Sequence, residues 1–301
     1  MVKSGASYLQ GPTLLKVKLL AKECCVNGKT TELKKQIICI NWGDKYGPRY
    51  INRLYGMVAR NCAPPFSFYC FTDKADGIRP EVKVRALPPI RVPMPTGSRG
   101  IWPKSRLWGS QLAELSGPVL YMDLDLLILK SIDPFFSYGN EGDVILARNL
   151  NTPFERLGQT SLFRFPVGSL LPLQEKFERD PQGIADKYEF EQRFVTREAP
   201  HGVKFFPLLW VGHFKLMCIP PFPFNYLFPP RKPRLPKVLI FPGGLNQDLA
   251  SQGRWSSDYS YWGPWGHMKK TFSPNRPGLS KLEFIRHFLR PSNWIREVWI
   301  D

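Results

Sequence analysis

The feature that most constrains this chain is an apolar run interrupted by two aspartates, "VLYMDLDLLIL" at residues 119–129. Residues 118–125 predict a buried strand, because the run before the aspartates is short and continuously apolar. Asp123 and Asp125 are costly there unless something compensates their charge. A hard divalent cation with oxygen ligands would do so. The alternative is a strand that simply ends in polar residues before a turn.

Strand-like and helix-like segments alternate around this run. Strands are predicted at 36–42, 66–73, 82–87 and 143–148, and helices at 47–61 and 103–115. This alternation predicts an α/β fold with a mostly parallel sheet that is covered on both faces. Ligands of such sheets bind at the carboxyl ends of the strands. Asn41, Asp73 and the two aspartates all fall at such ends.

Beyond residue 150 the pattern predicts strands at 160–165 and 237–241 and helices near 172–180 and 185–195. We expect three parts: a basic lead-in over 1–35 with one short helix, an α/β domain over 36–245, and an amphipathic tail over 246–301. The tail sequence 281–299 predicts basic helices broken at Pro291. Their apolar residues either pack on the core or face a membrane.

Charge and cysteines narrow the classes of partner and compartment. The 42 Lys and Arg against 25 Asp and Glu give a net charge of +17, which favours an anionic partner. The basic residues are dispersed, so a dedicated nucleic-acid arm is not expected. Six cysteines without a C-x-x-C pair favour reduced thiols in a cytoplasmic protein, and the alternative is a disulfide or zinc framework. Lysines interrupt "LLKVKLLAKECC", so we expect no secretory signal, and no apolar run is long enough to span a membrane.

The segment "VLYMDLDLLILKSIDPFF" resembles the D-x-D strand of GT-A glycosyltransferases, with its apolar run, D-x-D and following D-P-F. The resemblance extends over residues 36–300 to a family of bacterial glycosyltransferases. That family is distantly similar to the glycogenin-like and lipooligosaccharide galactosyltransferase group. The segments that carry it, in the same order, are "NWGDKYGPRYINRLYGMVARN", "FYCFTD", "WPKSRL", "TSLFRF", "WVGHFK", "FPGGLN" and "RPSNWIREVW".

The resemblance implies a GT-A-like domain with a nucleotide-sugar donor, a divalent metal (Mn²⁺ or Mg²⁺) and a hydroxyl acceptor. Asp125 would be the principal metal ligand, and Asp123 would bind the metal and lie near the donor ribose or sugar. Asn41, Trp42 and Tyr46 would line the base and ribose pocket, where an aromatic ring can stack on the base. Asp73 would accept hydrogen bonds from the base or, alternatively, cap its own turn.

Two further pairs have candidate roles. Lys104 and Arg106 would reach the donor phosphates from the start of a helix, where backbone N–H groups also favour an anion. The alternative for both is a solvated helix face. Glu191 and Gln192 in "EFEQRF" resemble the acidic-Gln pair that faces the reacting sugar, which is usually Asp-Gln. A role of Glu191 as base or nucleophile is one interpretation, and an exposed helical Glu is the other. Three polar residues would contact the sugar or acceptor: Gln159, Thr160 and Ser161.

The segment "VLIFPGGLNQD" departs from the wider pattern. Related enzymes place a metal-binding histidine after this strand, whereas this chain has Pro242, followed by Gly243 and Gly244. A Gly-Gly turn still lets backbone N–H groups approach a phosphate. The third metal ligand would be Asn246, His213 or water, and Lys215 would assist phosphate or acceptor binding. We therefore expect weaker or more hydrated metal binding.

The resulting hypothesis is a metal-dependent glycosyltransferase of bacterial envelope polysaccharide synthesis. It would use a UDP-type donor and a glycan or lipid-linked acceptor, at the inner face of the cytoplasmic membrane. One rival is a non-catalytic basic protein on a degenerate GT-A-like scaffold, which Pro242 and Glu191 favour. The other is a nucleotidyltransferase, although no G-x-G-x-x-G loop follows the first strand.

Overall fold

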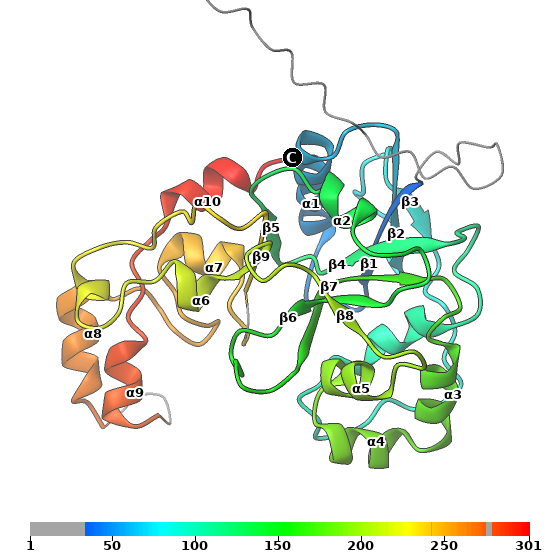
Figure 1. Cartoon of the computed structure of the whole chain (residues 1–301). Helices are drawn as coiled ribbons and strands as arrows, with labels where there is room; N and C mark the ends of the chain where they lie inside the picture. The colour runs from blue at the N-terminus through cyan, green and yellow to red at the C-terminus, as the bar shows by residue number, and fades with distance from the viewer. Residues whose placement is uncertain (1–33, 242, 275–278) are drawn as a thin grey trace, which may run out of the picture. The chain divides into compact units, whose positions relative to one another are not determined.

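A seven-stranded sheet forms the centre of the computed structural model (Figure 1). Its strands are β1 (Lys35–Asn41), β2 (Phe66–Thr72), β3 (Lys83–Arg85), β4 (Pro118–Met122), β6 (Ile145–Arg148), β7 (Gly158–Pro166) and β8 (Lys204–Phe205). They lie in the order β3-β2-β1-β4-β7-β6-β8. The structure describes residues 34–241, 243–274 and 279–301. The predictions for the basic lead-in up to residue 33, including its short helix and lack of a signal, and for Pro242 therefore lie outside the described residues.

The large sheet is mostly parallel, as the alternation of elements predicted. Parallel pairs join β1 to β2 and β4, β2 to β3, and β6 to β8. Strand β7 runs antiparallel to both of its neighbours. Met122, the last residue of β4, pairs with Leu162 in the middle of β7, so the first residues of β7 extend past the end of β4. The beginning of β7 consequently lies at the same edge of the sheet as the carboxyl ends of β1 and β4.

A second sheet begins directly after the two aspartates. It contains β5 (Leu126–Ile128), β9 (Val211–His213) and β10 (Val238–Ile240), with β10 in the middle. Strand β5 is antiparallel to β10, and β9 is parallel to it. The aspartates therefore occupy the turn at which the chain leaves the large sheet and enters the small one. The sequence predicted one strand over 118–125 and did not anticipate this change of sheet.

Helices cover both faces of the large sheet, as predicted. Alternate residues of β1 belong to different cores: Ile37 and Cys39 pack in one, Ile38 and Ile40 in the other. The first core includes helix α1 (Pro48–Asn61). The second includes the 3₁₀ helix η1 (Trp102–Trp108), α3 (Leu171–Arg179), α4 (Pro181–Tyr188) and α5 (Glu191–Glu198). The remaining helices are α2 (Asp133–Ser137), α6 (Phe214–Met217), η2 (Phe224–Tyr226), α7 (Gln247–Gln252), α8 (Gly263–Thr271), α9 (Lys281–Arg286) and α10 (Asn293–Val298).

Two predicted helices differ in the structure. The predicted helix 103–115 is a 3₁₀ helix that stops before Gly109, whose backbone is extended. Leu112 and Leu115 instead pair in an isolated β-bridge and are buried. The predicted helix 185–195 is broken between α4 and α5, because Glu189 has a φ of 63°. A helix cannot continue through a left-handed residue, so the chain turns there and presents Glu191 at the start of α5.

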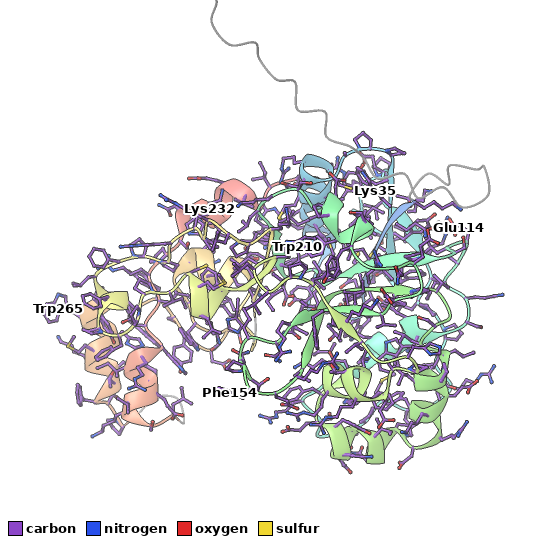
Figure 2. The ribbon with its side chains drawn as sticks, in the orientation of Figure 1. Lys35, Glu114, Phe154, Trp210, Lys232 and Trp265 are labelled. Atoms are coloured by element: carbon purple, nitrogen blue, oxygen red, sulfur yellow. The ribbon has the colours of Figure 1, made fainter. Side chains whose placement is uncertain are left out.

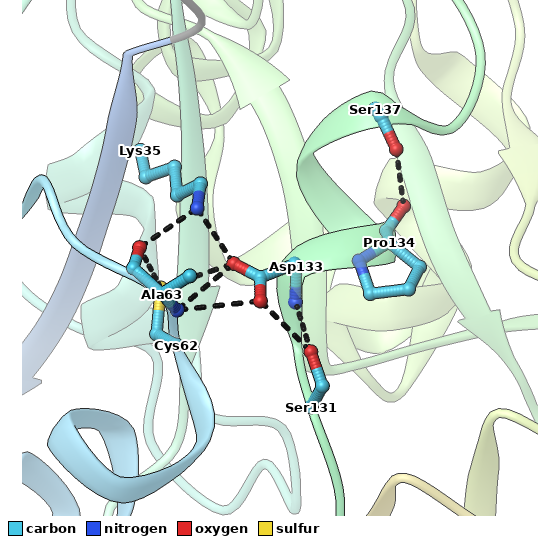
Figure 3. A network of polar contacts seen from close by, with 7 residues as sticks. All are labelled: Lys35, Cys62, Ala63, Ser131, Asp133, Pro134 and Ser137. Atoms are coloured by element: carbon cyan, nitrogen blue, oxygen red, sulfur yellow. Dashed lines mark hydrogen bonds and ion pairs between the residues drawn. The ribbon is translucent and has the colours of Figure 1, made fainter. Parts of the chain in front are cut away.

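The Asp133 carboxylate of the "DPFF" segment has a structural role (Figure 3). It accepts hydrogen bonds from the Lys35 ammonium at 2.7 Å and from the Ser131 hydroxyl at 2.9 Å. It also accepts one from the backbone N–H of Ala63 at 3.1 Å. Although burial alone would raise the pKa of Asp133, these partners outweigh burial and lower it. The network ties the start of β1 to the turn after α1 and to α2.

The C-terminal tail packs its apolar face onto the body of the protein. Phe284, Phe288, Ile295 and Trp299 are all buried. The capping box of Ser280 and Glu283 starts α9. Within the described residues, no helix is long and apolar enough to cross a membrane. The four described cysteines are free thiols: Cys39, Cys62, Cys70 and Cys218.

Candidate active site

Two adjoining pockets lie where the carboxyl ends of β1 and β4 meet the start of β7. The smaller has a volume of about 150 Å³ and is lined by Asn41, Trp42 and Tyr46, among others. The larger has a volume of about 580 Å³ and includes Glu191, Gln192, Gln159 and Ser161 from the other side, and His213, Lys215, Gly243 and Gly244 from the small sheet. Five residues line both: Lys45, Ile101, Lys104, Asp123 and Asp125. The two pockets therefore form one site with the aspartates in its middle.

Neighbouring groups bond both oxygens of the Asp123 carboxylate, one of which has Lys104 as its single hydrogen-bond partner among the described residues. The Lys104 ammonium lies 2.8 Å from one of its oxygens and 3.0 Å from the other. The Tyr121 hydroxyl donates a further bond at 2.6 Å. The backbone N–H of Asp123 donates to the Ser161 carbonyl in β7 at 2.9 Å, which fixes the residue at the sheet edge. The negative charge of Asp123 is thus compensated within the protein.

Lys104 lies between two carboxylates, Asp123 and Glu191, and compensates their charge. It is only 4% exposed, and its ammonium also lies 3.8 Å from Glu191. Burial alone would lower the pKa of Lys104, but the charges of Asp123 and Glu191 outweigh burial and raise it. The lysine therefore stays charged at neutral pH. Its place on η1 follows from the 3₁₀ geometry of "WPKSRLW", which buries Trp102 and Trp108 in the core.

Both carboxylate oxygens of Glu191 are engaged as well. One accepts from the Thr160 hydroxyl at 2.9 Å, and the other accepts from the backbone N–H of Ile101 at 2.7 Å. This buried carboxylate joins α5 to β7 and to the entry of η1, so the geometry suits a positioning role better than that of a base. Gln192 lines the larger pocket.

Asp125 has a different environment. One of its oxygens accepts a bond from the Tyr46 hydroxyl at 2.7 Å. Among the ion pairs of the described residues, none includes Asp125, whereas Lys104 is bonded to Asp123. Desolvation, followed by repulsion from Asp123, raises the pKa of Asp125 to about 6, although the Tyr46 hydroxyl and Lys45 oppose that shift. The site therefore contains a carboxylate that a bound cation would stabilise.

The turn that carries Asp125 is held by a residue far along the chain. The side-chain amide of Gln247, which is completely buried, donates to the carbonyls of Leu126 at 2.8 Å and Leu124 at 3.4 Å. These carbonyls flank Asp125 on both sides. The Gln247 carbonyl oxygen has no hydrogen-bond partner among the described residues. Sequence reasoning missed Gln247, because only the third dimension brings α7 to the turn.

His213 ends β9 and is 2% exposed. Its Nδ1 accepts a bond from the backbone N–H of Leu216 at 3.3 Å, so in the neutral ring the proton is on Nε2. Burial, then the charge of Lys215, lowers the pKa of His213 to about 4, which keeps the ring neutral at pH 7. The Nε2–H has no partner among the described residues. This arrangement suits donation to an anion rather than metal ligation, which needs a lone pair.

The small sheet adds further groups that suit an anion. Gly243 and Gly244 have backbone φ angles of 69° and 80°, which residues other than glycine rarely adopt. Both line the larger pocket with Lys215, whose ammonium lies 4.6 Å above the Trp255 ring. Burial lowers the pKa of Lys215. Among the described residues of this edge, Lys215 supplies the positive charge.

Three predicted site residues lie elsewhere. Arg106 lines a separate pocket and donates to the Pro88 carbonyl at 2.7 Å. Asp73 is exposed and accepts from the backbone N–H of Gly43 at 3.3 Å. The Asn246 side-chain oxygen accepts from Leu249 N–H at 2.9 Å, so it caps α7 and is not directed to the aspartates as a ligand. The sequence singled out neither Tyr121 nor Lys45, although both are polar residues beside predicted site residues.

The donor set at the aspartates consists of hard oxygen atoms. No three His, Cys, Asp or Glu side chains of the described residues gather closely enough to ligate one metal ion. A divalent cation would therefore take its protein ligands from Asp125 and Asp123 and the remainder of its shell from bound ligand and water, which suits Mg²⁺ or Mn²⁺. The uncompensated charge of Asp125 fits such an ion.

Comparison with solved structures identifies the fold of this chain. No family model matches the chain, and no curated protein matches it. The galactosyltransferase LgtC, solved in complex with donor and acceptor sugar analogs, superposes with a TM-score of 0.51 at 14% identity, covering 87% of this chain and 99% of LgtC. GlyE of Streptococcus pneumoniae has a TM-score of 0.45 at 10% identity, with coverages of 88% and 64%. Mouse xyloside xylosyltransferase 1 has 0.43 at 14% identity, with coverages of 68% and 97%. The similarity to LgtC confirms the GT-A-like α/β fold that the D-x-D segment predicted.

Proposed function

From a GT-A-like fold whose sheet edge carries a charged pocket, we propose that this protein is a metal-dependent glycosyltransferase. It transfers a sugar from a nucleoside diphosphate donor of uridine type to a hydroxyl of a glycan or lipid-linked acceptor. The observation that carries the proposal is Asp125, a desolvated carboxylate without an ion-pair partner among the described residues, beside an otherwise compensated network. A carboxylate in this state is expected where a cation completes the site.

In this proposal the base of the donor binds in the smaller pocket and its diphosphate binds in the larger one. Trp42 and Tyr46 line the smaller pocket, where an aromatic face can stack on the base. Lys215, the Gly243–Gly244 backbone and the Nε2–H of His213 border the larger pocket, where they would hold the diphosphate. Asp125 and Asp123 would hold the divalent cation, which when bound neutralises charge on the departing nucleotide. Lys104 forms an ion pair with Asp123 and orients its carboxylate.

In the reaction, an acceptor oxygen forms a bond to the anomeric carbon, while the bond between that carbon and the diphosphate oxygen breaks. The electron pair of the broken bond stays on the diphosphate, whose charge the lysines offset. The acceptor hydroxyl gives its proton to an oxygen of the departing diphosphate. Gln192, Gln159 and Ser161 border the space that the sugar and acceptor would occupy. Glu191 acts through Lys104 and Thr160, as a positioning residue.

We place this reaction in the synthesis of bacterial envelope polysaccharide, at the inner face of the cytoplasmic membrane. The high positive charge of the chain supports a setting rich in anionic phosphate groups. The galactosyltransferase with the same fold was solved with donor and acceptor sugar analogs, which supports a sugar donor here.

Calorimetry with UDP, GDP and CMP, each with and without Mn²⁺, tests the proposal. We expect one nucleotide to bind in a metal-dependent manner and Asp125→Asn to remove the metal dependence. The exposed Asp76→Asn serves as the matched control. Salt-sensitive binding of every polyanion without metal would instead support a non-catalytic binding protein. Release of free sugar or transfer from the nucleotide sugar that binds, followed by chromatography, then establishes the reaction.

A further inference from the structure

One surface of the molecule exposes large apolar side chains that no described segment covers. Helix α8 carries Trp265, 77% exposed, and Met268, with Phe272 directly after its last residue, 67% exposed. These positions follow the spacing i, i+3 and i+7, so they share one side of the helix. We call this side the α8 face. Figure 2 shows Trp265 at the outer edge of the molecule.

Helices η2, α8 and α9 and the segment after α9 pack together, and we call them the module. The exposure of the α8 face therefore does not come from a loose helix. His267, on another side of α8, is buried and bonds the Tyr226 hydroxyl at 2.7 Å through Nδ1. The rings of His267 and Phe284 stack with centroids 4.5 Å apart, which joins α8 to α9. The Asn225 amide donates to the Phe288 carbonyl at 2.8 Å, which joins η2 to the segment after α9. The module thus has its own core, and the α8 face is directed away from it.

The same module exposes a second set of apolar residues. The segment around η2 presents four that are each at least 45% exposed: Phe222, Phe224, Leu227 and Phe228. Single exposed apolar residues are ordinary, but several on one small module mark an interaction surface. Tryptophan and phenylalanine next to lysine are the residues that lie in the interface of a bilayer.

The excess of basic residues in this module favours an anionic partner. Residues 219–237 contain four basic and no acidic residues, and Glu283 is the only acidic residue in 259–290. That glutamate is used locally in the capping box with Ser280. Lys269 and Lys270 are in α8 itself, and the Lys281 ammonium lies 5.9 Å above the Phe272 ring. In an isologous contact between two copies these lysines would face one another, so a second copy is disfavoured.

We propose that the α8 face is a docking surface for an anionic phospholipid bilayer. Trp265 and Phe272 enter the headgroup region, while Lys269, next to Met268 in α8, and Lys281, beside the Phe272 ring, contact lipid phosphates. The inference uses no residue of the proposed active site, so it stands separately from glycosyl transfer. Because the structure buries Phe284, Ile295 and Trp299 of the tail, the membrane contact proposed here is made by α8 and not by those residues.

Sedimentation of the full chain with vesicles tests this surface. We expect binding to equimolar phosphatidylglycerol and phosphatidylcholine, and much weaker binding to phosphatidylcholine alone. The double variant Trp265→Ser/Phe272→Ser should bind at least about tenfold more weakly, because it removes the apolar area that enters the bilayer. Lys269→Gln/Lys281→Gln should lose roughly fivefold per charge at low salt. Circular dichroism checks that each variant is folded.

Matched controls make the test specific. Phe154→Ser removes a fully exposed phenylalanine outside the module, and Lys176→Gln removes an exposed lysine of α3; both should bind vesicles as the wild type does. Equal binding by wild type and the Trp265/Phe272 variant would overturn the proposal. So would a dimer, detected by sedimentation equilibrium, that this variant abolishes. Asp125→Asn should bind vesicles normally, so failure of the proposed function is distinguishable from failure of this surface.

Discussion

The two aspartates of the D-x-D turn are two residues apart, yet they belong to walls of the site that are built in opposite ways. On the wall of η1, β7 and α5, Asp123 is bonded by Lys104 and Tyr121, and the nearby Glu191 by Thr160 and Ile101. On the wall of α7 and the loop between β1 and α1, Asp125 accepts a bond from Tyr46, and among the described residues it forms no ion pair. The first wall is complete as a folded structure, whereas the second leaves a charge that the proposed cation would compensate. The contrast teaches that motif spacing alone does not assign equal roles to the two carboxylates.

The largest expected effect comes from breaking the complete wall. Lys104→Met leaves Asp123 and Glu191 buried without their cation, and the free energy of unfolding should fall by about 3–5 kcal/mol. Urea denaturation measures this loss. The control is Lys176→Met, which removes an exposed ion pair with Glu198 and should cost about 1 kcal/mol or less. Equal losses in the two variants would show that the Lys104 network is no more than a surface pair.

The second prediction concerns ligand binding at the incomplete wall. Asp125→Asn should weaken metal-dependent nucleotide binding by at least about tenfold, a change of about 1.4 kcal/mol, because it removes the carboxylate that would hold the cation. Asp76→Asn should leave the affinity unchanged. Calorimetry in the presence and absence of Mn²⁺ gives both values. Unaltered affinity in Asp125→Asn would place the cation elsewhere.

The stability of the same variant should move in the opposite direction. The pKa of Asp125 is raised to about 6 in the folded protein, so its charged form destabilises the fold at pH 7, and protonation removes that cost as the pH falls below about 6. In metal-free buffer, Asp125→Asn should therefore unfold at an equal or higher urea concentration than the wild type at pH 7. The difference should shrink towards pH 5. A variant less stable than the wild type at pH 7 would contradict this account of the wall.

A third variant tests whether Gln247 fixes the turn that carries Asp125. Gln247→Leu keeps the volume of the buried side chain but leaves the carbonyls of Leu124 and Leu126 without their donor. The free energy of unfolding should fall by about 2 kcal/mol, and nucleotide affinity should fall with it because the turn is no longer fixed. Gln182→Leu, at an exposed glutamine, is the control for stability. Loss of stability with full nucleotide affinity would separate Gln247 from the site.

The smallest effect is expected at a carboxylate that is compensated but partly exposed. Lys35→Met removes the partner of Asp133, and the free energy of unfolding should fall by about 1 kcal/mol or less at pH 7. The pKa of Asp133 is lowered in the folded protein, so the stability from this network is present at neutral pH and is lost as the pH falls below about 4. Wild type and variant should then converge in acid denaturation. A larger loss than in Lys104→Met would reverse the ranking of the networks.

Much of the fold was predictable because its signals are local. The β1 segment "KQIICIN" and the α1 stripe of Ile51, Leu54 and Val58 carry the periodicities of strand and helix within a few residues. The exceptions also have physical causes. Helix 103–115 was wrong because Gly109 ends the 3₁₀ turn and because Leu112 and Leu115 are buried in a bridge instead.

The site residues were predictable in type and less so in role. Asn41, Trp42, Tyr46, Lys104 and the aspartates were predicted together and line the smaller pocket. Arg106 has the same local signal as Lys104, but on η1 it points to Pro88. Lys104 and Arg106 are two residues apart, so on a 3₁₀ helix their side chains are directed to different sides. The roles of the predicted residues remain predictions until nucleotide binding is measured.

The sequence by itself determined the alternation of strands and helices, the net positive charge, and the placement of two carboxylates at the end of a buried strand, because each of these depends only on residue type and spacing. Tertiary structure alone decided which carboxylate is compensated. Lys104 reaches Asp123 from 19 residues away, and Gln247 reaches the turn from more than 120. It also decided which apolar residues of the C-terminal region are covered, since Trp299 is buried and Trp265 is exposed. The energy of a charge or an apolar side chain depends on what surrounds it in space, and that surrounding comes from segments distant in the chain.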